Sequence, residues 1–229
     1  MFEPGEVISY PQMSLEEGVS LQRGMNFRLN GGPSVILMSL RRGAPYADRI
    51  EQDGRILIYE GHDVPRRKEG PDPKTVDQPM TNPGGTLTQN GQFNEAAMNF
   101  KRGEAPAEPV KVYEKLRGGI WVYNGLFRLV DAWQEISNAR HVFKFKLEIT
   151  DQNIAPGPGK GIDHDRLIPT AVKLEVWKRD KGKCVLCGSK DNLHFDHIIP
   201  YSQGGSSLVI ENVQLLCARH NLAKRDRIE

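Results

Sequence analysis

The stretch "LLCARHNLAK", residues 215–224, places a cysteine, a histidine and an asparagine close together near the end of the chain. Cys217 and His220 have the spacing of a zinc knuckle, in which two residues separate two ligands. An earlier stretch, "CVLCG", repeats this spacing at Cys184 and Cys187, and the chain has no other cysteine. Tetrahedral structural zinc takes four such ligands, so the two knuckles predict one zinc site. The alternative is three unrelated buried thiols and a surface histidine.

The cysteines also bear on the cellular location. All three lie in the last quarter of the 229 residues, and an odd number in a reducing compartment indicates metal or thiol chemistry rather than disulfides. The N-terminal "MFEPGEVISY" lacks the basic and apolar segments of a secretory signal. The longest apolar run, "SVILM", is too short to span a bilayer. We therefore expect a cytoplasmic protein that does not bind membranes.

The net charge is unevenly distributed along the chain. The whole chain has a formal charge of +2. Residues 168–229 carry ten Lys/Arg against seven Asp/Glu, a net of +3, and the preceding 167 residues carry 21 against 22, a net of −1. A basic surface that binds nucleic acid can coexist with a nearly neutral total, so a nucleic-acid partner is not excluded.

The stretch "DQNIAPGPGKGIDHD", residues 151–165, alternates proline and glycine with polar residues and has no apolar periodicity. Such a composition is typical of a linker. We therefore expect a front domain over residues 1–150, a linker over residues 151–167 and a C-terminal domain over residues 168–229. A chain of this length can bury two modest cores.

The front domain is expected to be rich in strands. In "HVFKFKLEI", apolar residues alternate with Lys144, Lys146 and Glu148, as in a strand with one buried face. "GRILIYEG", "VKVYEKL" and "GIWVYNGLFRLVDAW" are further β-branched or aromatic runs, and "FNEAAMNFKRG" predicts a helix that ends at Gly103. A strand-rich domain with short helices predicts a barrel-like, strongly curved sheet.

The C-terminal domain begins with a helical pattern, "TAVKLEVWKRDKG", which Thr170 is expected to cap. Two strands, "LHFDHII" and "VQLLC", and a last helix, "ARHNLAKRDR", follow. The apolar core of so small a domain is marginal, so we expect the zinc ion to be structural. The two domains together predict an α+β fold.

The segment between the knuckles resembles the HNH nuclease motif. The resemblance covers roughly residues 170–227 and depends on Asp196-His197, Pro200, Gly204-Gly205, Asn212 and the "LLC" run. HNH domains fold as a ββα unit that holds one divalent metal, so the resemblance implies a metal-dependent DNA endonuclease. Hydrolysis of a phosphodiester requires a base to activate water and a cation to neutralise charge on the phosphate.

The resemblance implies a role for each motif residue. His197 would be the general base, and Asn212 would orient its imidazole or support the loop. Asp196 and Asn221 would hold the catalytic ion, which is Mg²⁺, Mn²⁺ or a similar divalent cation. The alternatives are an ordinary polar Asp-His pair and a turn residue at position 212.

The front domain resembles the SRA domain, a PUA-like fold. The resemblance depends on "YNGLFRLVDAWQEISNARHVFKFKLEI", on "EPVKVYEKLRGG" before it, and on "LIYEGHD" and "DQPMT" in the same order. The family signature is Tyr-Asp-Gly, whereas this chain has Tyr123-Asn124-Gly125, and the asparagine keeps a carbonyl acceptor but loses the charge. SRA domains bind modified cytosine by flipping it from duplex DNA into a pocket.

Such a pocket needs aromatic faces to stack the base and a group that reads its Watson–Crick edge. The stretch "APYADRIEQDGRILIYEG" supplies Tyr46 and Tyr59 as stacking faces. Asp48 would accept a hydrogen bond from the cytosine amino group, and Asp53 is an alternative because the spacing needs a one-residue shift. Otherwise both tyrosines belong to the core and Asp48 to a surface loop.

Two basic clusters are candidates for contact with DNA phosphates. The first is Arg66, Arg67 and Lys68, in the long loop after "YEGHD". The second is Lys224 and Arg225, on the predicted last helix. Runs of charge are usually only solvated, so solvation is the alternative for both.

Taken together, these features resemble the modification-dependent restriction endonucleases of the SRA–HNH type. We expect binding of double-stranded DNA that carries 5-methylcytosine, or a related modified cytosine, by base flipping, with phosphodiester hydrolysis nearby. Because one HNH site cuts one strand, a double-strand break implies a homodimer. The alternatives are an HNH nicking or homing-type nuclease that ignores methylation, and a methyl-DNA binding protein whose nuclease is silent.

Overall fold

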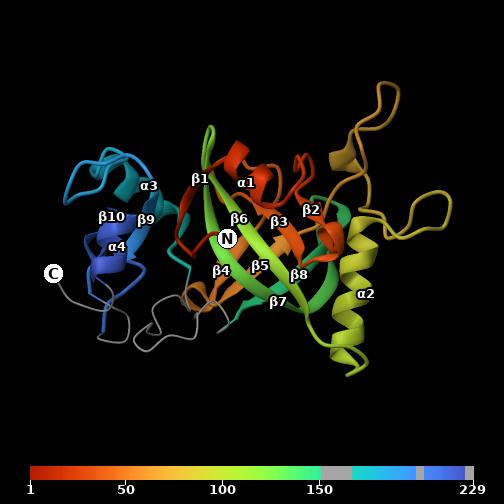
Figure 1. Ribbon diagram of the computed structural model, residues 1–229. Coiled ribbons are helices and arrows are strands. Elements are labelled where there is room, and N and C mark those ends of the chain that lie inside the picture. The colour runs from red at the N-terminus through yellow and green to blue at the C-terminus, as the bar shows by residue number, and fades with distance from the viewer. Residues whose placement is uncertain (151–166, 200–203, 225–229) are drawn as a thin grey trace.

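The computed structural model describes residues 1–150, 167–199 and 204–224. These residues form one large sheet and one small sheet, with helices beside both (Figure 1). The predicted α+β class is therefore confirmed. The predicted linker lies outside the described residues except for Leu167, which is buried in the core of the front domain and donates its N–H to the Gly54 carbonyl at 3.0 Å.

The large sheet has eight strands, and seven of them follow the order β2-β3-β6-β7-β8-β5-β4, while β1 pairs with β7. β3 and β6 run parallel, and the other pairs are antiparallel. The sheet curves strongly but is open, because its path ends at β2 and β4 without closing into a barrel (Figure 1). The strands are β1 (Val7–Ser9), β2 (Met25–Asn26), β3 (Ser34–Met38), β4 (Arg49–Glu51), β5 (Ile56–Glu60), β6 (Glu108–Arg117), β7 (Ile120–Ser137) and β8 (Arg140–Ile149).

The alternation in β8 is confirmed on its apolar face and wrong in one place on its polar face. Phe143, Phe145 and Leu147 are buried and belong to the main core of the front domain. Lys144 was expected to face solvent, yet only 1% of it is exposed. Its ammonium is buried because Glu60 on β5 neutralises it at 2.9 Å.

Helix α2 (Gln89–Lys101) packs against β7 and covers one side of the large sheet (Figure 1). The Thr88 hydroxyl caps its first turn by accepting the Gly91 N–H at 3.1 Å. Gly91 is needed there, because a Cβ would lie 2.2 Å from the Met80 carbonyl oxygen. The helix begins at Gln89, earlier than the predicted start at Phe93. It ends two residues before Gly103, whose φ is +72°.

The other helices of the front domain are short. They are α1 (Tyr10–Glu16) and three 3₁₀ turns, η1 (Leu29–Gly31), η2 (Gln52–Gly54) and η3 (Pro73–Thr75). Among the described residues, no helix is long and apolar enough to cross a membrane. The expected cytoplasmic location stays a prediction.

The C-terminal part is a ββα unit preceded by a helix. Its elements are α3 (Thr170–Arg179), β9 (Leu193–His197), the turn η7 (Ile210–Asn212), β10 (Val213–Cys217) and α4 (Ala218–Lys224). β9 and β10 are antiparallel, with His197 opposite Val213. The expectation that Thr170 caps α3 is wrong, because Pro169 occupies the cap position and the Thr170 hydroxyl donates to Glu114 of the front domain.

Candidate functional site

The four predicted zinc ligands converge in the ββα unit. Cys184 Sγ and Cys217 Sγ each lie 3.3 Å from His220 Nδ1, and Cys187 Sγ lies 3.8 Å from Cys217 Sγ. All four ligand atoms lie within 4.8 Å of one another. A tetrahedral zinc ion with Zn–S bonds of about 2.3 Å separates its ligand atoms by roughly 3.8 Å. The cluster therefore has the donor set and the spacing that zinc requires.

The first knuckle also favours the thiolate form that binds metal. Burial raises the pKa of the Cys184 thiol, but backbone N–H groups of the two knuckles lower it more, and the resulting pKa is about 6. Gly188 closes the knuckle with a φ of +75° and donates its N–H to the Cys184 carbonyl at 2.8 Å. A lowered thiol pKa favours metal binding near neutral pH.

Asp196 and His197 lie at the end of β9, beside the loop that leads to β10. His197 is 7% exposed, and its Nε2 lies 2.9 Å from the hydroxyl oxygen of Ser207. Ser207 is itself buried, so this contact holds the imidazole in one orientation. The motif did not single out Ser207, although it follows the Gly204-Gly205 pair by two residues.

Asn212 bonds the backbone between β9 and β10. Its side-chain oxygen accepts the Ile199 N–H at 2.7 Å, and its amide donates to the Ile199 and Ser206 carbonyls at 3.0 and 3.1 Å. Gly205 packs into the same turn, where a Cβ would lie 1.8 Å from the Ile199 carbonyl oxygen. These contacts fit support of the loop, one of the two roles expected for Asn212, and its catalytic assignment stays a prediction. Pro200, the remaining motif residue of this loop, lies outside the described residues.

Lys224 differs from the expectation that it contacts phosphate. It is 1% exposed, and its Nζ lies 2.6 Å from Asp196 Oδ2 and also bonds the His197 carbonyl. The ammonium therefore neutralises the carboxylate that was expected to hold the catalytic ion. Asn221 lies partly exposed on the same helix, directly after the zinc ligand His220. Arg225 lies outside the described residues.

The donor chemistry of Asp196 and Asn221 suits a hard divalent cation. Carboxylate and amide oxygens are ligands that Mg²⁺ and Mn²⁺ accept. The Lys224 ammonium shows that a cation already fits against Asp196. A divalent ion at this carboxylate would take over the neutralising role of that ammonium.

The front domain contains a cavity of about 350 Å³. Asp48 lies in it, and its two carboxylate oxygens accept the N–H groups of Glu60 at 3.0 Å and Ser39 at 3.3 Å. Burial raises the pKa of Asp48 to about 7, against the effect of these two hydrogen bonds. The residues that line the cavity come from three separate parts of the sequence: Ser39–Asp48 except Arg42, then Glu60 and Lys74, and then Ser137, Asn138 and Arg140.

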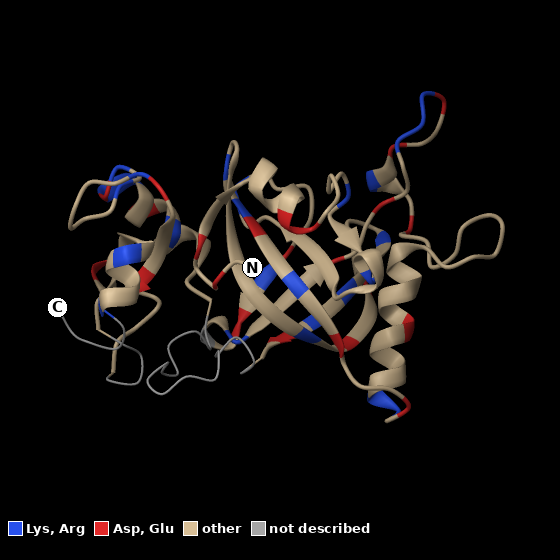
Figure 2. Cartoon of the chain, viewed as in Figure 1, with Lys and Arg blue, Asp and Glu red and all other residues tan. Residues whose placement is uncertain are grey.

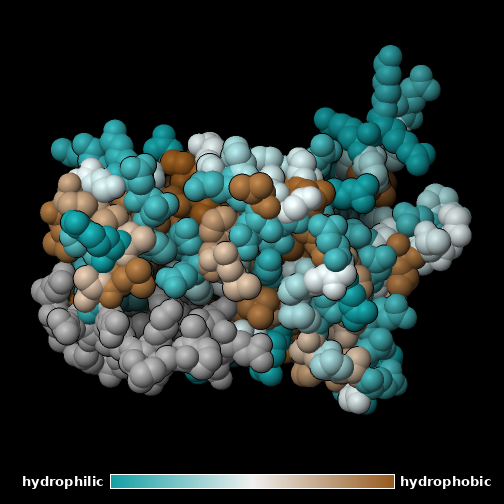
Figure 3. All heavy atoms as spheres, in the orientation of Figure 1, coloured by the Kyte–Doolittle hydropathy of each residue, from teal (hydrophilic) through white to brown (hydrophobic). Residues whose placement is uncertain are grey.

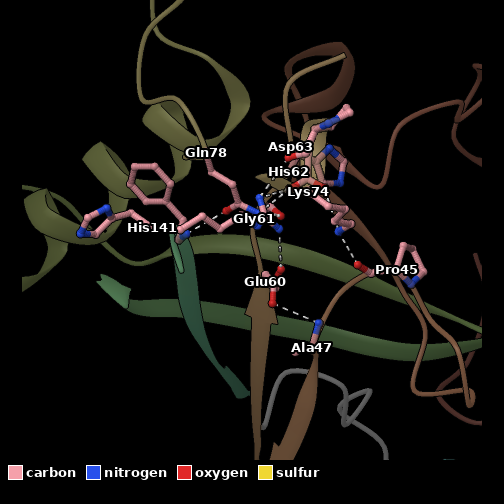
Figure 4. Close-up of polar contacts among 12 residues, drawn as sticks. Pro45, Ala47, Glu60, Gly61, His62, Asp63, Lys74, Gln78 and His141 are labelled. Atoms are coloured by element: carbon pink, nitrogen blue, oxygen red, sulfur yellow. Dashed lines mark hydrogen bonds and ion pairs between the residues drawn. The ribbon is translucent and has the colours of Figure 1, made fainter. Parts of the chain in front are cut away.

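Buried charges lie behind Asp48. Glu60 is 3% exposed and accepts a hydrogen bond from Lys144 at 2.9 Å. It also accepts the Ala47 N–H at 3.1 Å (Figure 4). Arg140 lies 3.5 Å from the other Glu60 oxygen and 2.6 Å from Asp63. Each acidic group in this network therefore has a cationic partner, which keeps the backbone around the cavity in one arrangement.

The structure separates the two tyrosines that were expected to stack a base. Tyr46 lines the cavity, whereas Tyr59 is 1% exposed, belongs to the core and does not line it. His62 lies against both: its ring stacks on Tyr46 at 5.5 Å between centroids and 16° between planes, and its Nε2 lies 3.2 Å from the Tyr59 hydroxyl. Burial lowers the pKa of His62 to about 4, so the imidazole is neutral near pH 7.

Lys74 also covers the Tyr46 ring, with its Nζ 4.1 Å from the ring centroid. The same ammonium bonds the Pro45 carbonyl and lies 2.7 Å from Asp63 (Figure 4). A base that takes the face of Tyr46 covered by His62 must displace that imidazole. The Asp53 side chain, the alternative reader of the base edge, lies outside the described part of the structure.

The sequence did not point to three residues that line the cavity, Glu60, Lys74 and Arg140, or to two that contact its lining, His62 and Lys144. The only signal in the sequence was "YEGHD", in which two acidic residues and a histidine follow Tyr59. Nothing in the sequence near Arg140 or Lys144 indicated the cavity, because pairing of β5 with β8 places Lys144 opposite Glu60, and Arg140 begins the same strand.

The basic loop protrudes from the front domain. Arg66, Arg67 and Lys68 are all exposed, and Arg66 forms one loose ion pair, 3.7 Å from Asp72. Figure 2 shows the Lys and Arg residues of this loop at the opposite end of the molecule from the ββα unit. Figure 3 shows that the surface of the loop is hydrophilic. The phosphate-binding role stays a prediction.

Residues 184–227 match the family model described as HNH endonuclease. The C-terminal unit is an HNH domain. The match spans both zinc knuckles together with Asp196, His197 and Asn212. It supports a nuclease as the activity of this part of the chain. No curated protein matches the chain.

Three solved structures are similar to this chain, over different shares of its length. The SUVH5 SRA domain in complex with fully methylated CG DNA is 24% identical over 68% of this chain and 90% of that chain, with a TM-score of 0.43. KRYPTONITE in complex with mCHG DNA and SAH is 15% identical over 70% of this chain and 34% of that chain, with a TM-score of 0.45. The modification-dependent TagI restriction endonuclease is 21% identical over 96% of this chain and 76% of that chain, with a TM-score of 0.39. At these levels of similarity, the role of the front domain has to be inferred from its own residues.

Proposed function

We propose that this chain is a modification-dependent DNA endonuclease, in which the front domain binds 5-methylcytosine flipped out of double-stranded DNA and the HNH domain hydrolyses a phosphodiester nearby. The observation that carries the proposal is the HNH match over residues that include Asp196 and His197. The cavity around Tyr46 and Asp48 supports the part of the proposal that concerns selection of the modified base.

His197 is the proposed general base, because histidine takes up a proton near neutral pH. The Ser207 hydroxyl holds its ring, and Asn212 bonds the backbone of Ile199 and Ser206. Asp196 and Asn221 would bind a divalent ion, which when bound supplies the positive charge that stabilises the phosphate in the transition state. The zinc beside the first turn of α4 would be structural, since its four protein ligands leave no open position.

Asp48 is the proposed reader of the cytosine edge. A carboxylate accepts a hydrogen bond from the cytosine amino group, and a carboxyl that keeps its proton can also donate to the ring nitrogen beside it. Its pKa of about 7 makes both forms accessible near neutral pH. Tyr46 supplies one stacking face once His62 leaves it.

The second candidate function is a methyl-DNA binding protein with a silent nuclease. The observation that favours it is the Lys224 ammonium on Asp196, in the place where a divalent ion would be needed. If Lys224 does not give way to a metal ion, the HNH domain would remain folded without cutting DNA.

The test is digestion of matched plasmids, methylated or unmethylated at cytosine, with Mg²⁺ or Mn²⁺. We expect cutting of the methylated plasmid only. Equal cutting of both plasmids would support a nuclease that ignores methylation, and no cutting with either metal, together with retained binding of methylated DNA, would support the silent binder.

A variant of Asp48 connects this preference to the cavity. Asp48→Ala should lower the preference for methylated DNA while zinc content stays unchanged. Asp77→Ala is the matched control, because Asp77 is exposed and lies outside the cavity lining. If the preference survives in Asp48→Ala, the base is read by other residues.

We further expect a homodimer, because one HNH site cuts one strand. The expectation is checked by measuring the mass of the complex with DNA in solution. A monomer that produces only nicks would contradict it.

A further inference from the structure

The HNH domain and the front domain share one hydrophobic core. Leu116 and Val122, from β6 and β7, are buried against residues of the HNH domain. The HNH side chains of this core belong to α3, β9 and β10: Val172, Val176, Leu193, Phe195, Val213, Leu215 and Leu216. Separation of the two domains would expose this core to water, which opposes independent movement of the HNH domain.

A buried ion pair joins the domains next to this core. Lys173 on α3 and Glu114 on β6 are 2% and 0% exposed at their side chains, and Lys173 Nζ lies 2.6 Å from Glu114 Oε2. The Thr170 hydroxyl donates to the other Glu114 oxygen. Burial alone would raise the pKa of Glu114. The charge of Lys173 and the hydrogen bonds that Glu114 accepts lower this pKa below its usual range. The Glu114 side chain thus favours its carboxylate form in the interior.

Asn124, the residue that replaces aspartate in the Tyr-Asp-Gly signature, completes this network. Its side-chain oxygen accepts from Lys173 Nζ at 2.7 Å, and its amide nitrogen donates to Glu114 Oε2 at 3.0 Å. An aspartate here could not donate to Glu114 and would place two carboxylates beside one ammonium. Unpaired charge is costly in the interior, so the amide suits a site that already holds one cation and one anion.

Backbone hydrogen bonds also join β9, the strand that carries Asp196 and His197, to the front domain. Phe195, next to Asp196 on β9, donates its N–H to the Gly5 carbonyl at 3.0 Å. On its other side, Gly5 donates to the Tyr123 carbonyl at 2.8 Å. Gly5 has a φ of +86°, and a Cβ there would lie 2.9 Å from the Phe195 carbonyl oxygen. Figure 1 shows the HNH domain beside β1 and the β6–β7 hairpin.

We propose that Lys173, Glu114 and Asn124 are positioning residues that fix the HNH active site relative to the base-binding cavity, and thereby set the distance between the modified cytosine and the cut. This inference depends on the proposed function. None of the three residues belongs to the cavity lining or to the HNH motif. Their effect would be on where DNA is cut, through the placement of one domain on the other.

The test uses a DNA duplex with a single 5-methylcytosine and maps the cut positions at nucleotide resolution. The wild-type protein should cut at one main position on each strand. Lys173→Met leaves Glu114 buried without its cation, so the interface should loosen, the cuts should spread to neighbouring positions, and cutting at the main position should fall about tenfold. Zinc content and binding of the methylated duplex should stay unchanged.

Two further variants separate positioning from general damage. Glu114→Gln/Lys173→Met removes both charges at once and should restore the wild-type cut position. Lys178→Met is the matched control, because Lys178 lies on the same helix with an exposed side chain. A Lys173→Met protein with wild-type cut positions would overturn the proposal, and so would a double variant that cuts as diffusely as Lys173→Met.

A measurement without DNA keeps this inference distinguishable from the proposed function. Hydrogen exchange at the Phe195 N–H reports the interdomain hydrogen bond to Gly5 directly. Exchange should be faster in Lys173→Met than in wild type and return to the wild-type rate in the double variant. If wild type ignores methylation but this pattern holds, the proposed function fails while the interface stands. If exchange at Phe195 is unaltered in Lys173→Met, the interface proposal fails whatever the nuclease does.

Discussion

The HNH domain and the cavity of the front domain differ in how their residues are distributed along the chain. The zinc ligands and the motif residues Asp196, His197, Asn212 and Asn221 all lie within residues 184–221. The cavity takes its lining from residue 39 to residue 140, across strands that are distant in sequence. A site with short spacings can be recognised from the order of its residues, whereas a site assembled by strand pairing needs the fold.

Loss of zinc should unfold the HNH domain and leave the front domain folded. Structural zinc sites contribute about 10 kcal/mol or more to folding, so His220→Ala should lose both zinc and cutting. Asn221→Ala, one residue further, should keep zinc and lose only cutting. Metal analysis and near-UV circular dichroism of both variants check this.

Binding of methylated DNA should persist in His220→Ala, because the large sheet and the cavity of the front domain lie outside the HNH domain. His141→Ala is the control, since the His141 side chain is 54% exposed and lies far in sequence from the four predicted zinc ligands. A His220→Ala protein that keeps its zinc would contradict the ligand assignment.

Removal of the proposed base should affect catalysis alone. His197→Ala should slow cutting by a factor of about 10² to 10⁴, the usual contribution of a general base. Zinc content and DNA affinity should match those of wild type, because His197 is not a zinc ligand. Single-turnover cleavage rates check the size of the effect. An unaltered rate would move the base to another residue.

Ser207→Ala sharpens the same point. Loss of its contact with His197 Nε2 should leave the imidazole less well oriented and reduce the rate by less than His197→Ala does. A larger loss than in His197→Ala would show that Ser207 has its own catalytic role.

Titration of Asp48 should make the stability of the front domain depend on pH. Its pKa is about 7 in the folded protein and about 3.8 in the unfolded chain, so the folded state holds a proton that the unfolded state releases between these values. The stabilising contribution is complete below about pH 4 and is lost as the pH rises through 7. Wild type should therefore lose more stability than Asp48→Asn between pH 4 and pH 8, measured by urea unfolding.

His62 should have the opposite dependence, which allows the two groups to be separated. Its pKa is lowered from 6.5 to about 4, so its contribution is present above pH 6.5 and is lost as the pH falls through 4. His62→Gln should remove that loss at low pH. If neither variant alters the pH dependence, the two side chains are more hydrated than their burial implies.

Neutralisation of the basic loop should have the smallest effect. Arg66→Ala/Arg67→Ala/Lys68→Ala should weaken DNA binding and reduce the slope of log K against log salt by roughly 0.9 for each lost phosphate contact. The loss should be equal for methylated and unmethylated DNA, because phosphate contacts carry no base information. Arg102→Ala is the control, since Arg102 is exposed and paired with Glu104. An unchanged salt slope would show that the loop is only solvated.

Where sequence reasoning was incomplete, the missing information was three-dimensional. Lys144 was expected on a solvent face from the alternation of β8, and it is buried because β5 places Glu60 beside it. Lys224 was expected at phosphate, and it is buried because α4 packs its ammonium against Asp196. Tyr59 was expected in the pocket, and it lies in the core beneath His62. In all three cases the strand or helix that carries the residue was predicted, and only the partner of its side chain was missed.

The four candidate zinc ligands, the HNH motif, the strand-rich front domain and the α+β class could all be predicted from the sequence, because spacing and periodicity are local properties of a chain. Tertiary structure decided which side chains surround the cavity, which cation neutralises each buried carboxylate, and why position 124 holds an asparagine. The reason is that a buried charge is stable only beside its partner, and the partners Glu114 and Lys173 are 59 residues apart in sequence and meet only when the two domains pack together.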